Sequence, residues 1–551
     1  MSRASSAGRA QLTQSMLVVV LTASVFMAAF VYVKSRNRDG TAERQIQTVL
    51  EQLARQKTVD EELRAELDSG SHSLEEPLVV LDPYGDSPLT AVVLFETAYP
   101  SRISVSIHGV DAARDVDFAF DEYRRKHLIP VYGLYAESEN EVVLFATDQK
   151  DGVRRSSLKI QTEKLHPGLE NVCVDILKSD TAQSEPGFTF LYANNPKFAF
   201  DANGDIRWCL DLPSLQSTLY DYGGHMILAS GHTEYGETLL YEVDLLGRLY
   251  SISLTPYGVH HDIEEAGGGK LLVTGSGLGP TVEDLLYELD PSTGEIGTVL
   301  DFGSILDPLR PSVRRTDRDW LHMNAVTWSE SDSSILVSGR HQSAVVKLSY
   351  PGGGIEWILG NHDNWLPEYM KYLLTPTGGD FEWQYLQHSP TILPDQDNNP
   401  DTVDIILFDN HSYMDEKPDT DPETRYSRLV QYRIDENAKT VEQIWEYGRE
   451  RGNELFSAIC GVSEYLPNGG ILGYFSLALG HRIGYSRIIE LRHDTREVIL
   501  DAVIYSKAGD SRNDYRATRR ELYSQSDNDL GDLQPCRENI PQEMLKNANT
   551  R

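Results

Sequence analysis

The chain has 551 residues, of which 40% are hydrophobic, so it can bury more than one core. Acidic residues outnumber basic ones 84 to 50, and the formal net charge is −34. This balance excludes a general affinity for nucleic acid, which needs a basic surface, and it means that an anionic substrate requires a local positive cluster.

The N-terminal segment, residues 1–40, contains an uncharged run of 19 residues at 15–33. That length is sufficient for a helix to span a bilayer. Basic residues lie on both sides of the run, and no good cleavage site of small residues follows it, so we expect an uncleaved transmembrane signal anchor. The flanking charges nearly balance and leave the membrane orientation open.

Residues 41–74 are predicted to form a helical stalk. The stretch 41–69 contains no proline or glycine, and its apolar residues fall largely on one face of a helix. These residues are Ile46, Val49, Leu50, Leu53, Leu63 and Leu67. Two interpretations stay open: a solvated stalk that lifts the body off the membrane, or a short coiled coil that joins copies into a homo-oligomer.

Residues 75–165 alternate between polar and apolar side chains in short runs, which are separated by glycine, proline, aspartate and asparagine. Such runs are typical of short strands joined by turns. We therefore expect a small antiparallel β-sandwich as the N-terminal domain. It holds no cluster of reactive side chains that would indicate a site.

Residues 166–507 repeat two units. The first is a polar turn followed by an aliphatic strand, at 221–231, 264–275, 329–339 and 465–475. The second is a strand, a turn and another strand, at 239–250, 285–297, 344–359, 429–448 and 488–500. Repeats of about four strands are the signature of a β-propeller. We predict an all-β chain with a six-bladed β-propeller over 166–507, followed by a polar tail over 508–551.

Aligning the repeats on their first turn places His261, His322 and His388 in the same phase, each at the start of an innermost strand. Innermost strands line the central channel of a propeller, so three imidazoles should meet at one end of it. Arg340 follows the second strand of the blade that holds His322, and its planar guanidinium suits a sulfate or a phosphate. Asn324 is either a polar group of the channel that binds substrate or a plain turn residue.

Three polar neighbours are given structural roles. His260 and His341 each adjoin a candidate site residue in a segment expected to be extended, so their side chains should face away from the site. Asp409 could orient an imidazole, but we favour a role in capping a turn.

Several motifs, in the same order along the chain, resemble the bacterial arylsulfate sulfotransferases that do not use PAPS. In the propeller they are DWLHMNAVTW, SILVSGRHQSAVVKL, EWILG, FEWQYLQHS, LFDN, RYSRLVQYRID and QIWEYGRERG, and in the small domain they are DPYGDSPLTAVVLF and IPVYGLYAE. The resemblance runs from about residue 75 to 480. It implies a six-bladed propeller with its active site in the channel, an N-terminal sandwich, and a catalytic body in the periplasm or an equivalent exterior space.

By this resemblance, His388 matches the histidine that becomes transiently sulfated. His322 and Arg340 match residues that hold the sulfuryl group, and His261 matches the histidine that handles the phenol proton. The sequence departs from the family pattern before residue 388, where TPTGGDFEW lacks a cysteine pair that some members carry. The segment after LFDN is more acidic than expected, and the stalk and the tail have no recognised counterpart.

The predicted reaction moves a sulfuryl group from an aryl sulfate to a phenol by a ping-pong route through a sulfohistidine. A neutral imidazole is both a nucleophile and a leaving group at neutral pH, so no PAPS, metal or other cofactor is expected. The alternative is a membrane-tethered, non-catalytic propeller that only binds. Three histidines are also a common metal-ligand set, although four scattered cysteines without a CxxC pair do not favour a thiolate site.

Overall fold

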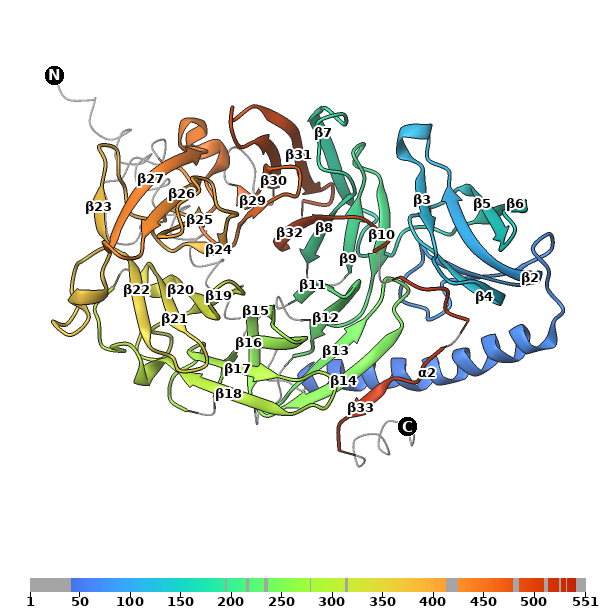
Figure 1. Cartoon of the computed structure of the whole chain (residues 1–551), viewed down its shortest axis with the longest axis horizontal. Coiled ribbons are helices and arrows are strands. Elements are labelled where there is room, and N and C mark those ends of the chain that lie inside the picture. Colours follow the sequence, from blue (N-terminus) through green and yellow to red (C-terminus); the bar gives the residue numbers. More distant parts are fainter. Residues whose placement is uncertain are drawn as a thin grey trace, which may run out of the picture.

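The computed structural model describes most of the chain from residue 41 onward, and its elements carry the labels of Figure 1. The described ranges are 41–193, 196–214, 218–231, 236–277, 279–312, 316–412, 425–478, 485–509, 514–524, 527–531 and 533–541. Strands dominate these ranges, as predicted for an all-β chain. No helix in this part of the chain is apolar and long enough to cross a membrane, and the predicted span at 15–33 lies outside the described residues.

The N-terminal domain is built around one long strand, β2 (Ala91–Ile107), which pairs with four others. Its first half pairs with β4 and its second half with β5. In the second half, Ile103, Val105 and Ile107 are buried and alternate with less buried neighbours, as expected for a strand with one covered face. The other strands are β1 (Leu78–Leu81), β3 (Val116–Ala119), β4 (Arg124–Val131), β5 (Glu139–Asp148) and β6 (Val153–Gln161).

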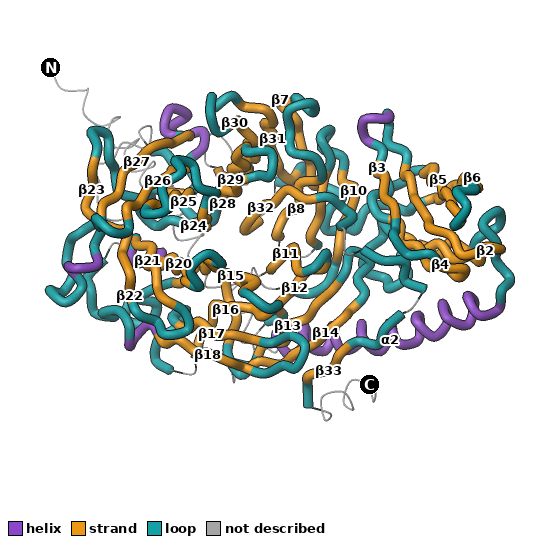
Figure 2. The backbone as a smooth tube through the Cα atoms, in the orientation of Figure 1, coloured by secondary structure: helices purple, strands orange, loops and turns teal. Residues whose placement is uncertain are grey.

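Six further sheets of four or five strands occur within the described ranges, and Figures 1 and 2 show them arranged in a ring. This is the arrangement of a β-propeller with six blades, and the innermost strands of neighbouring blades contact one another. From the inside outward, the first three blades contain β32 (Asp514–Arg520), β8 (Phe188–Ala193), β9 (Lys197–Phe200) and β10 (Ile206–Leu210); β11 (Thr218–Tyr222), β12 (His225–Ala229), β13 (Thr238–Val243), β14 (Leu249–Thr255) and β33 (Arg537–Asn539); and β15 (Gly258–Ala266), β16 (Lys270–Ser276), β17 (Leu285–Leu289) and β18 (Ile296–Asp301).

The other three blades follow in the same manner. They contain β19 (Met323–Ser329), β20 (Ser334–Gly339), β21 (Ala344–Ser349) and β22 (Ile355–Gly360); β24 (His388–Ile392), β25 (Thr402–Asp409), β26 (Arg428–Asp435), β27 (Thr440–Tyr447) and β23 (Thr375–Thr377); and β28 (Val462–Tyr465), β29 (Gly470–Ala478), β30 (Tyr485–Arg492), β31 (Val498–Ser506) and β7 (Val172–Ser179). Short 3-10 helices lie in connections: η1 (Ala112–Arg114), η2 (Phe302–Ser304), η3 (Arg340–Gln342), η4 (Met370–Tyr372) and η6 (Arg449–Leu455).

The middle strands of the blades are rich in aliphatic residues because a neighbouring blade covers each face. In β20, Ile335 packs in a cluster with Leu286 of the preceding blade. The next residue, Leu336, points the other way and packs in a cluster with Leu407 of the following blade. Stacking of blade on blade therefore explains the aliphatic strands that recur in the sequence.

The ring is closed by strands from both ends of the chain. β32 supplies the innermost strand of the first blade by pairing with β8, and β7 supplies the outermost strand of the last blade by pairing with β31. The predicted polar tail over 508–551 is therefore wrong for residues 514–520 and 537–539, which are strands of the propeller. Local pattern misses β32 because its partner strand lies more than 300 residues earlier.

The predicted stalk is the helix α2 (Thr41–Ser69), but it lies along the protein instead of standing clear of it (Figure 1). Its apolar residues Val49, Leu50 and Leu53 are buried in the core cluster shared by the small domain and the first blades. Gln56 donates a hydrogen bond to the Leu249 carbonyl at 2.9 Å and accepts one from the Leu249 N–H at 2.7 Å. The body of the same chain covers this face, which corrects both the solvated stalk and the coiled-coil seam.

Hydrogen bonds from side chains to backbone link the innermost strands of successive blades. On β15, the carboxylates of Asp262 and Glu264 accept from the N–H groups of Val326 and Trp328 on β19, at 3.0 and 3.2 Å. The later links are Thr327 to Pro390, Ser389 to Gly461, and Glu464 to Arg519. Each link supplies a partner for a backbone group that water does not reach, and together they tie these inner strands to one another.

Glu264 gives this ring a pH-dependent stability. Burial, followed by the nearby Asp262 carboxylate, raises the pKa of Glu264 to about 8. An unfolded glutamate loses its proton near pH 4.3, so stability is lost between that pH and about 8 as the unfolded state ionises first. Glu264→Gln keeps an acceptor for the Trp328 N–H without this penalty, and we expect a gain of about 1–2 kcal/mol at pH 9.

The measurement is the melting temperature of Glu264→Gln relative to wild type at pH 5 and at pH 9. The difference should be larger at pH 9. The matched control is Glu330→Gln, an exposed carboxylate of the neighbouring blade, which should show no such change between the two pH values. If the melting temperature of Glu264→Gln differed from that of wild type by the same amount at pH 5 and at pH 9, the raised pKa of Glu264 would be contradicted.

Candidate active site

The three histidines predicted to meet do lie together at the starts of innermost strands. His261 lies in β15, His322 directly precedes β19, and His388 begins β24. The rings of His261 and His322 are 4.6 Å apart between centroids. The ring of Tyr515, from β32, neighbours both His261 and His388. Its centroid is 5.6 Å from that of the His261 ring and 6.2 Å from that of the His388 ring. The site is therefore assembled from four different blades.

The backbone departs from regular strand geometry where each histidine lies. His261 and His322 have φ values of 61° and 53°, and Ser389, after His388, has 49°. The pairing register of the strand also shifts at each of the three places. Such bulges turn side chains out of the normal alternation and are frequent beside active sites. Here they direct imidazoles into the centre of the ring.

His388 is held in one tautomer by Asn410, which follows β25. The Nδ1 atom of His388 lies 2.6 Å from Oδ1 of Asn410. The Nδ2 group of Asn410 donates to the carbonyls of Ser457 and Cys460, both at 2.8 Å, so the amide cannot be turned round without losing two hydrogen bonds. Oδ1 must therefore accept from Nδ1–H, and Nε2 of His388 carries the lone pair.

The surroundings keep His388 neutral. Burial first, and then the positive charge of Arg340, hold the pKa of His388 well below its usual value. Arg340 lies in η3, immediately after β20, and is itself buried. Its backbone N–H donates to the His322 carbonyl at 3.1 Å, which ties η3 to the second histidine.

His322 has the opposite charge preference because two carboxylates contact it. Its Nδ1 atom lies 2.7 Å from Oε2 of Glu283 and 2.8 Å from Oδ2 of Asp319. Burial lowers the pKa of His322, but these two acids outweigh it and raise the pKa to about 9. The site thus contains a protonated imidazole beside a neutral one.

His261 is oriented by the same carboxylate. Its Nε2 atom lies 3.2 Å from Oε2 of Glu283, whose pKa is well below its usual value because the neighbouring imidazoles outweigh its burial. An ionised carboxylate can only accept, so Nε2 of His261 carries the proton. Nδ1 of His261 is then the basic nitrogen, and it is buried with no hydrogen-bond partner among the described residues. Burial lowers the pKa of His261, so the ring is neutral and ready to act as a base.

Asn324 is a fully buried side chain of β19, not an exposed turn residue. Its Nδ2 group donates to the Gln387 carbonyl at 2.8 Å, one residue before His388. The backbone carbonyl of Asn324 accepts from a guanidinium N–H of Arg516 at 2.9 Å and from the Tyr515 hydroxyl at 3.3 Å. In this structure Asn324 connects three blades around the site.

The expectation that His260 and His341 face away is wrong. The ring of His260 lies 5.1 Å from that of His261, because the positive φ of His261 breaks the alternation of an extended strand. His341 lies in the turn of η3, where the two-residue alternation does not apply, and it stacks on His322 at 4.4 Å.

Other residues of the site were not predicted. Glu283 and Asp319 lie in connections before β17 and β19, and Tyr515 and Arg516 come from the supposed tail. Asn410, the last residue of the LFDN motif, was not among the predicted site residues, whereas its neighbour Asp409 was considered as one. Asp409 accepts from the N–H groups of Tyr385 and His411 and from Arg428. Its Oδ2 atom also lies 3.1 Å from Nδ1 of His411, so Asp409 orients an imidazole as well, although not one of the three predicted site histidines.

The family of the protein follows from this architecture together with direct comparison. Residues 174–516 match the family model described as Arylsulfotransferase (ASST), and residues 78–163 match the model described as Arylsulfotransferase Ig-like domain. The first match covers more than half of the chain and ends at Arg516, within β32. The chain belongs to the arylsulfotransferase family and is a sulfotransferase that acts on aryl sulfates.

Two curated relatives agree with this membership. The chain is 25% identical to the arylsulfate sulfotransferase AssT of Lelliottia amnigena over 555 aligned positions, which cover 78% of this chain and 90% of that protein. It is also 25% identical to AssT of Escherichia coli O6:H1, with the same coverage. Among solved structures, a putative 6-phosphogluconolactonase from Bacteroides fragilis is 10% identical, with a TM-score of 0.32 over 77% of this chain and 99% of that one, a likeness too low to bear on function.

Proposed function

We propose that the protein transfers a sulfuryl group from an aryl sulfate to a phenol by a ping-pong mechanism, with His388 as the covalent carrier. One observation carries this proposal: the buried Asn410 amide accepts from Nδ1 of His388 and so leaves a lone pair on Nε2. A neutral imidazole in that tautomer is a nucleophile that needs no further deprotonation. The family membership favours this enzyme over the alternative of a non-catalytic binding propeller.

In the first half-reaction, Nε2 of His388 attacks the sulfur of the donor. The N–S bond forms, the bond between sulfur and the aryl oxygen breaks, and its electron pair leaves with the phenolate. The sulfated ring carries a positive charge and keeps its proton on Nδ1. Because Oδ1 of Asn410 accepts from that proton, it stabilises the charge that develops on the ring.

In the second half-reaction, the acceptor phenol gives its proton to Nδ1 of His261 as its oxygen attacks sulfur. The N–S bond breaks, and His388 returns to its neutral form. His261 then passes the proton to the phenolate that leaves the next donor, so it serves as base and acid in turn. Glu283 holds the other nitrogen of His261 and stabilises the imidazolium between the two steps.

Two cationic groups are placed to bind the sulfuryl oxygens. The protonated ring of His322 owes its charge to Glu283 and Asp319, and the buried Arg340 is tied to His322 by its backbone N–H. Positive groups fixed in a buried site stabilise the oxygens in the transition state without reorganising. We assign Asn324 to the inner wall of this substrate site.

The proposal is tested by trapping the intermediate. The purified full-length protein is exposed briefly to p-nitrophenyl sulfate without acceptor, digested under mildly basic conditions, and examined by mass spectrometry. We expect an added mass of about 80 Da on the peptide that contains His388, which disappears when phenol is added. Transfer activity with no adduct on His388 in wild type, or an adduct on a different residue, would refute the role of His388.

We further propose that residues 15–33 anchor the enzyme in a membrane, with the catalytic body in the periplasm or an equivalent exterior space. The support is the uncharged length of this run. Expression of the full chain and of a chain lacking residues 1–40, followed by fractionation, tests it. The full chain should be in the membrane fraction and the shortened chain should not.

A further inference from the structure

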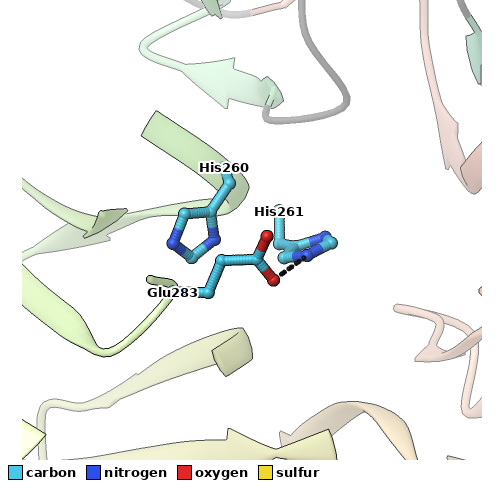
Figure 3. A group of neighbouring side chains, drawn as sticks. All are labelled: His260, His261 and Glu283. Carbon is cyan, nitrogen blue, oxygen red and sulfur yellow. Dashed lines mark hydrogen bonds and ion pairs between the residues drawn. The ribbon is translucent and has the colours of Figure 1, made fainter. Parts of the chain in front are cut away.

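His260 has no task in the proposed reaction, yet it lies in a cluster with His261 and Glu283 (Figure 3). Each of the three side chains offers one nitrogen or carboxylate oxygen, and these atoms all lie within 4.8 Å of one another. Figure 3 shows the carboxylate of Glu283 between the two imidazoles. All three residues are of intermediate burial.

Of the four ring nitrogens in this cluster, Nε2 of His261 contacts Glu283, and the other three have no hydrogen-bond partner among the described residues. Both ring nitrogens of His260 and Nδ1 of His261 are buried without a hydrogen bond to any described residue. Buried polar atoms are almost always paired, so three such nitrogens in one place point to a missing ligand. Every neutral imidazole has one nitrogen with a lone pair, and the natural partner of several lone pairs is a cation.

The set of two imidazoles and one carboxylate is suited to a divalent transition metal, and it leaves coordination positions open. The charge also fits, because the whole chain carries a formal charge of −34. A carboxylate has two oxygens, so Glu283 can bind a metal and keep its contact with His322. We propose that His260, His261 and Glu283 form a binding site for a divalent transition metal ion such as Zn²⁺.

A second group, Asp319, His322 and His341, has a similar composition. It is less available because it is already paired internally. Nδ1 of His322 contacts Asp319 at 2.8 Å, and Nδ1 of His341 contacts the Asp319 carbonyl at 2.8 Å. This group therefore provides a control.

The proposed ion would inhibit sulfuryl transfer, a consequence that rests on the proposed function. An ion held by His261 takes the lone pair that accepts the phenol proton. It also draws on the carboxylate that keeps His322 charged. His260 takes part in the metal site alone, so its removal should relieve the inhibition by Zn²⁺ and leave the rate without metal within about threefold of wild type.

The binding experiment uses the full-length protein after treatment with a chelator. The protein is dialysed against a series of free Zn²⁺ concentrations, and the bound metal is measured by plasma mass spectrometry without any substrate. We expect one tightly bound ion per chain, at least tenfold weaker binding in His260→Ala, and little change in His341→Ala. His388→Ala should bind Zn²⁺ as wild type does, whether or not it transfers sulfuryl groups.

Each outcome decides the matter. Binding that needs His260 but not His341 supports the site. Absence of a tightly bound ion in wild type, or equal binding by His260→Ala, overturns it. The His388→Ala arm separates the two proposals, because metal binding can succeed there even if the sulfohistidine mechanism is wrong. In the activity arm, equal inhibition of wild type and His260→Ala by Zn²⁺ would place the inhibitory ion elsewhere.

Discussion

His388→Ala should lose transfer from p-nitrophenyl sulfate to phenol by about 10,000-fold or more, as found when a covalent nucleophile is removed. The variant lacks the nitrogen that takes up the sulfuryl group, and the other imidazoles of the site cannot replace it. The free nitrogen of His261 is assigned to the phenol proton and comes from a different blade, and His322 is protonated and has no lone pair to offer. The initial rate of p-nitrophenol release measures the effect.

The loss must come from chemistry and not from unfolding. Removing the imidazole leaves a small cavity at the start of β24 and one unpaired acceptor on Asn410, so the melting temperature should fall only slightly. His493→Ala is a matched control, because it removes a half-buried imidazole that bonds Gln431 in β26, the third strand of its blade counted from the inside. It should keep its activity. A His388→Ala variant that retains near wild-type turnover would exclude His388 as the carrier.

Asn410→Leu should reduce kcat by about 100- to 10,000-fold while the KM for the aryl sulfate changes little. Leucine has nearly the same shape as asparagine but no acceptor for Nδ1–H of His388. The imidazole can then carry its proton on Nε2, which leaves no lone pair there to attack sulfur. A wrong tautomer has an effect of this size in other enzymes that depend on a fixed imidazole. Steady-state rates and the pre-steady-state burst of p-nitrophenol should fall together.

Asn410→Leu will also destabilise the fold, because the carbonyls of Ser457 and Cys460 lose their donor at a cost of about 1–3 kcal/mol. Ser427→Ala separates the two effects. The Ser427 hydroxyl donates to the carbonyls of Asn410 and Ser457 in the same buried network, but it does not touch the imidazole. We expect Ser427→Ala to lower the melting temperature and to keep the burst. An equal loss of burst in both variants would mean that Asn410 has only a structural role.

The architecture was largely predictable because its signals are local. An Asp- or Gly-rich turn between aliphatic strands recurs in the sequence, and each such unit is a hairpin of a blade. The common phase of His261, His322 and His388 could be predicted in the same way, since each lies shortly before the first turn of its own repeat. The small domain at 78–163 was also predictable, because polar and apolar residues alternate along its strands.

The helix α2 shows where local signals stop. Its length and its apolar face were clear in the sequence, but the partner of that face was not. The coiled-coil interpretation is excluded by contacts to residues nearly 200 positions later in the chain. Gln56 accepts from the backbone N–H of Leu249, and Asp60 accepts from the guanidinium of Arg248. An amphipathic pattern states that a face is buried and says nothing about the surface that covers it.

The sequence by itself determined a repeating β-fold, three imidazoles in phase and an arginine beside them. The tertiary structure alone decided the rest of the site. β32 brings Tyr515 and Arg516 into the centre through a pairing with β8, and the positive φ of His261 turns His260 toward Glu283. Asn410 reaches Nδ1 of His388 from the end of the neighbouring strand β25, and the carbonyls of Ser457 and Cys460, before β28 of the next blade, fix the orientation of its amide. Pairings between distant strands and departures from ideal backbone geometry depend on the packing of the whole ring, so no local pattern contains them.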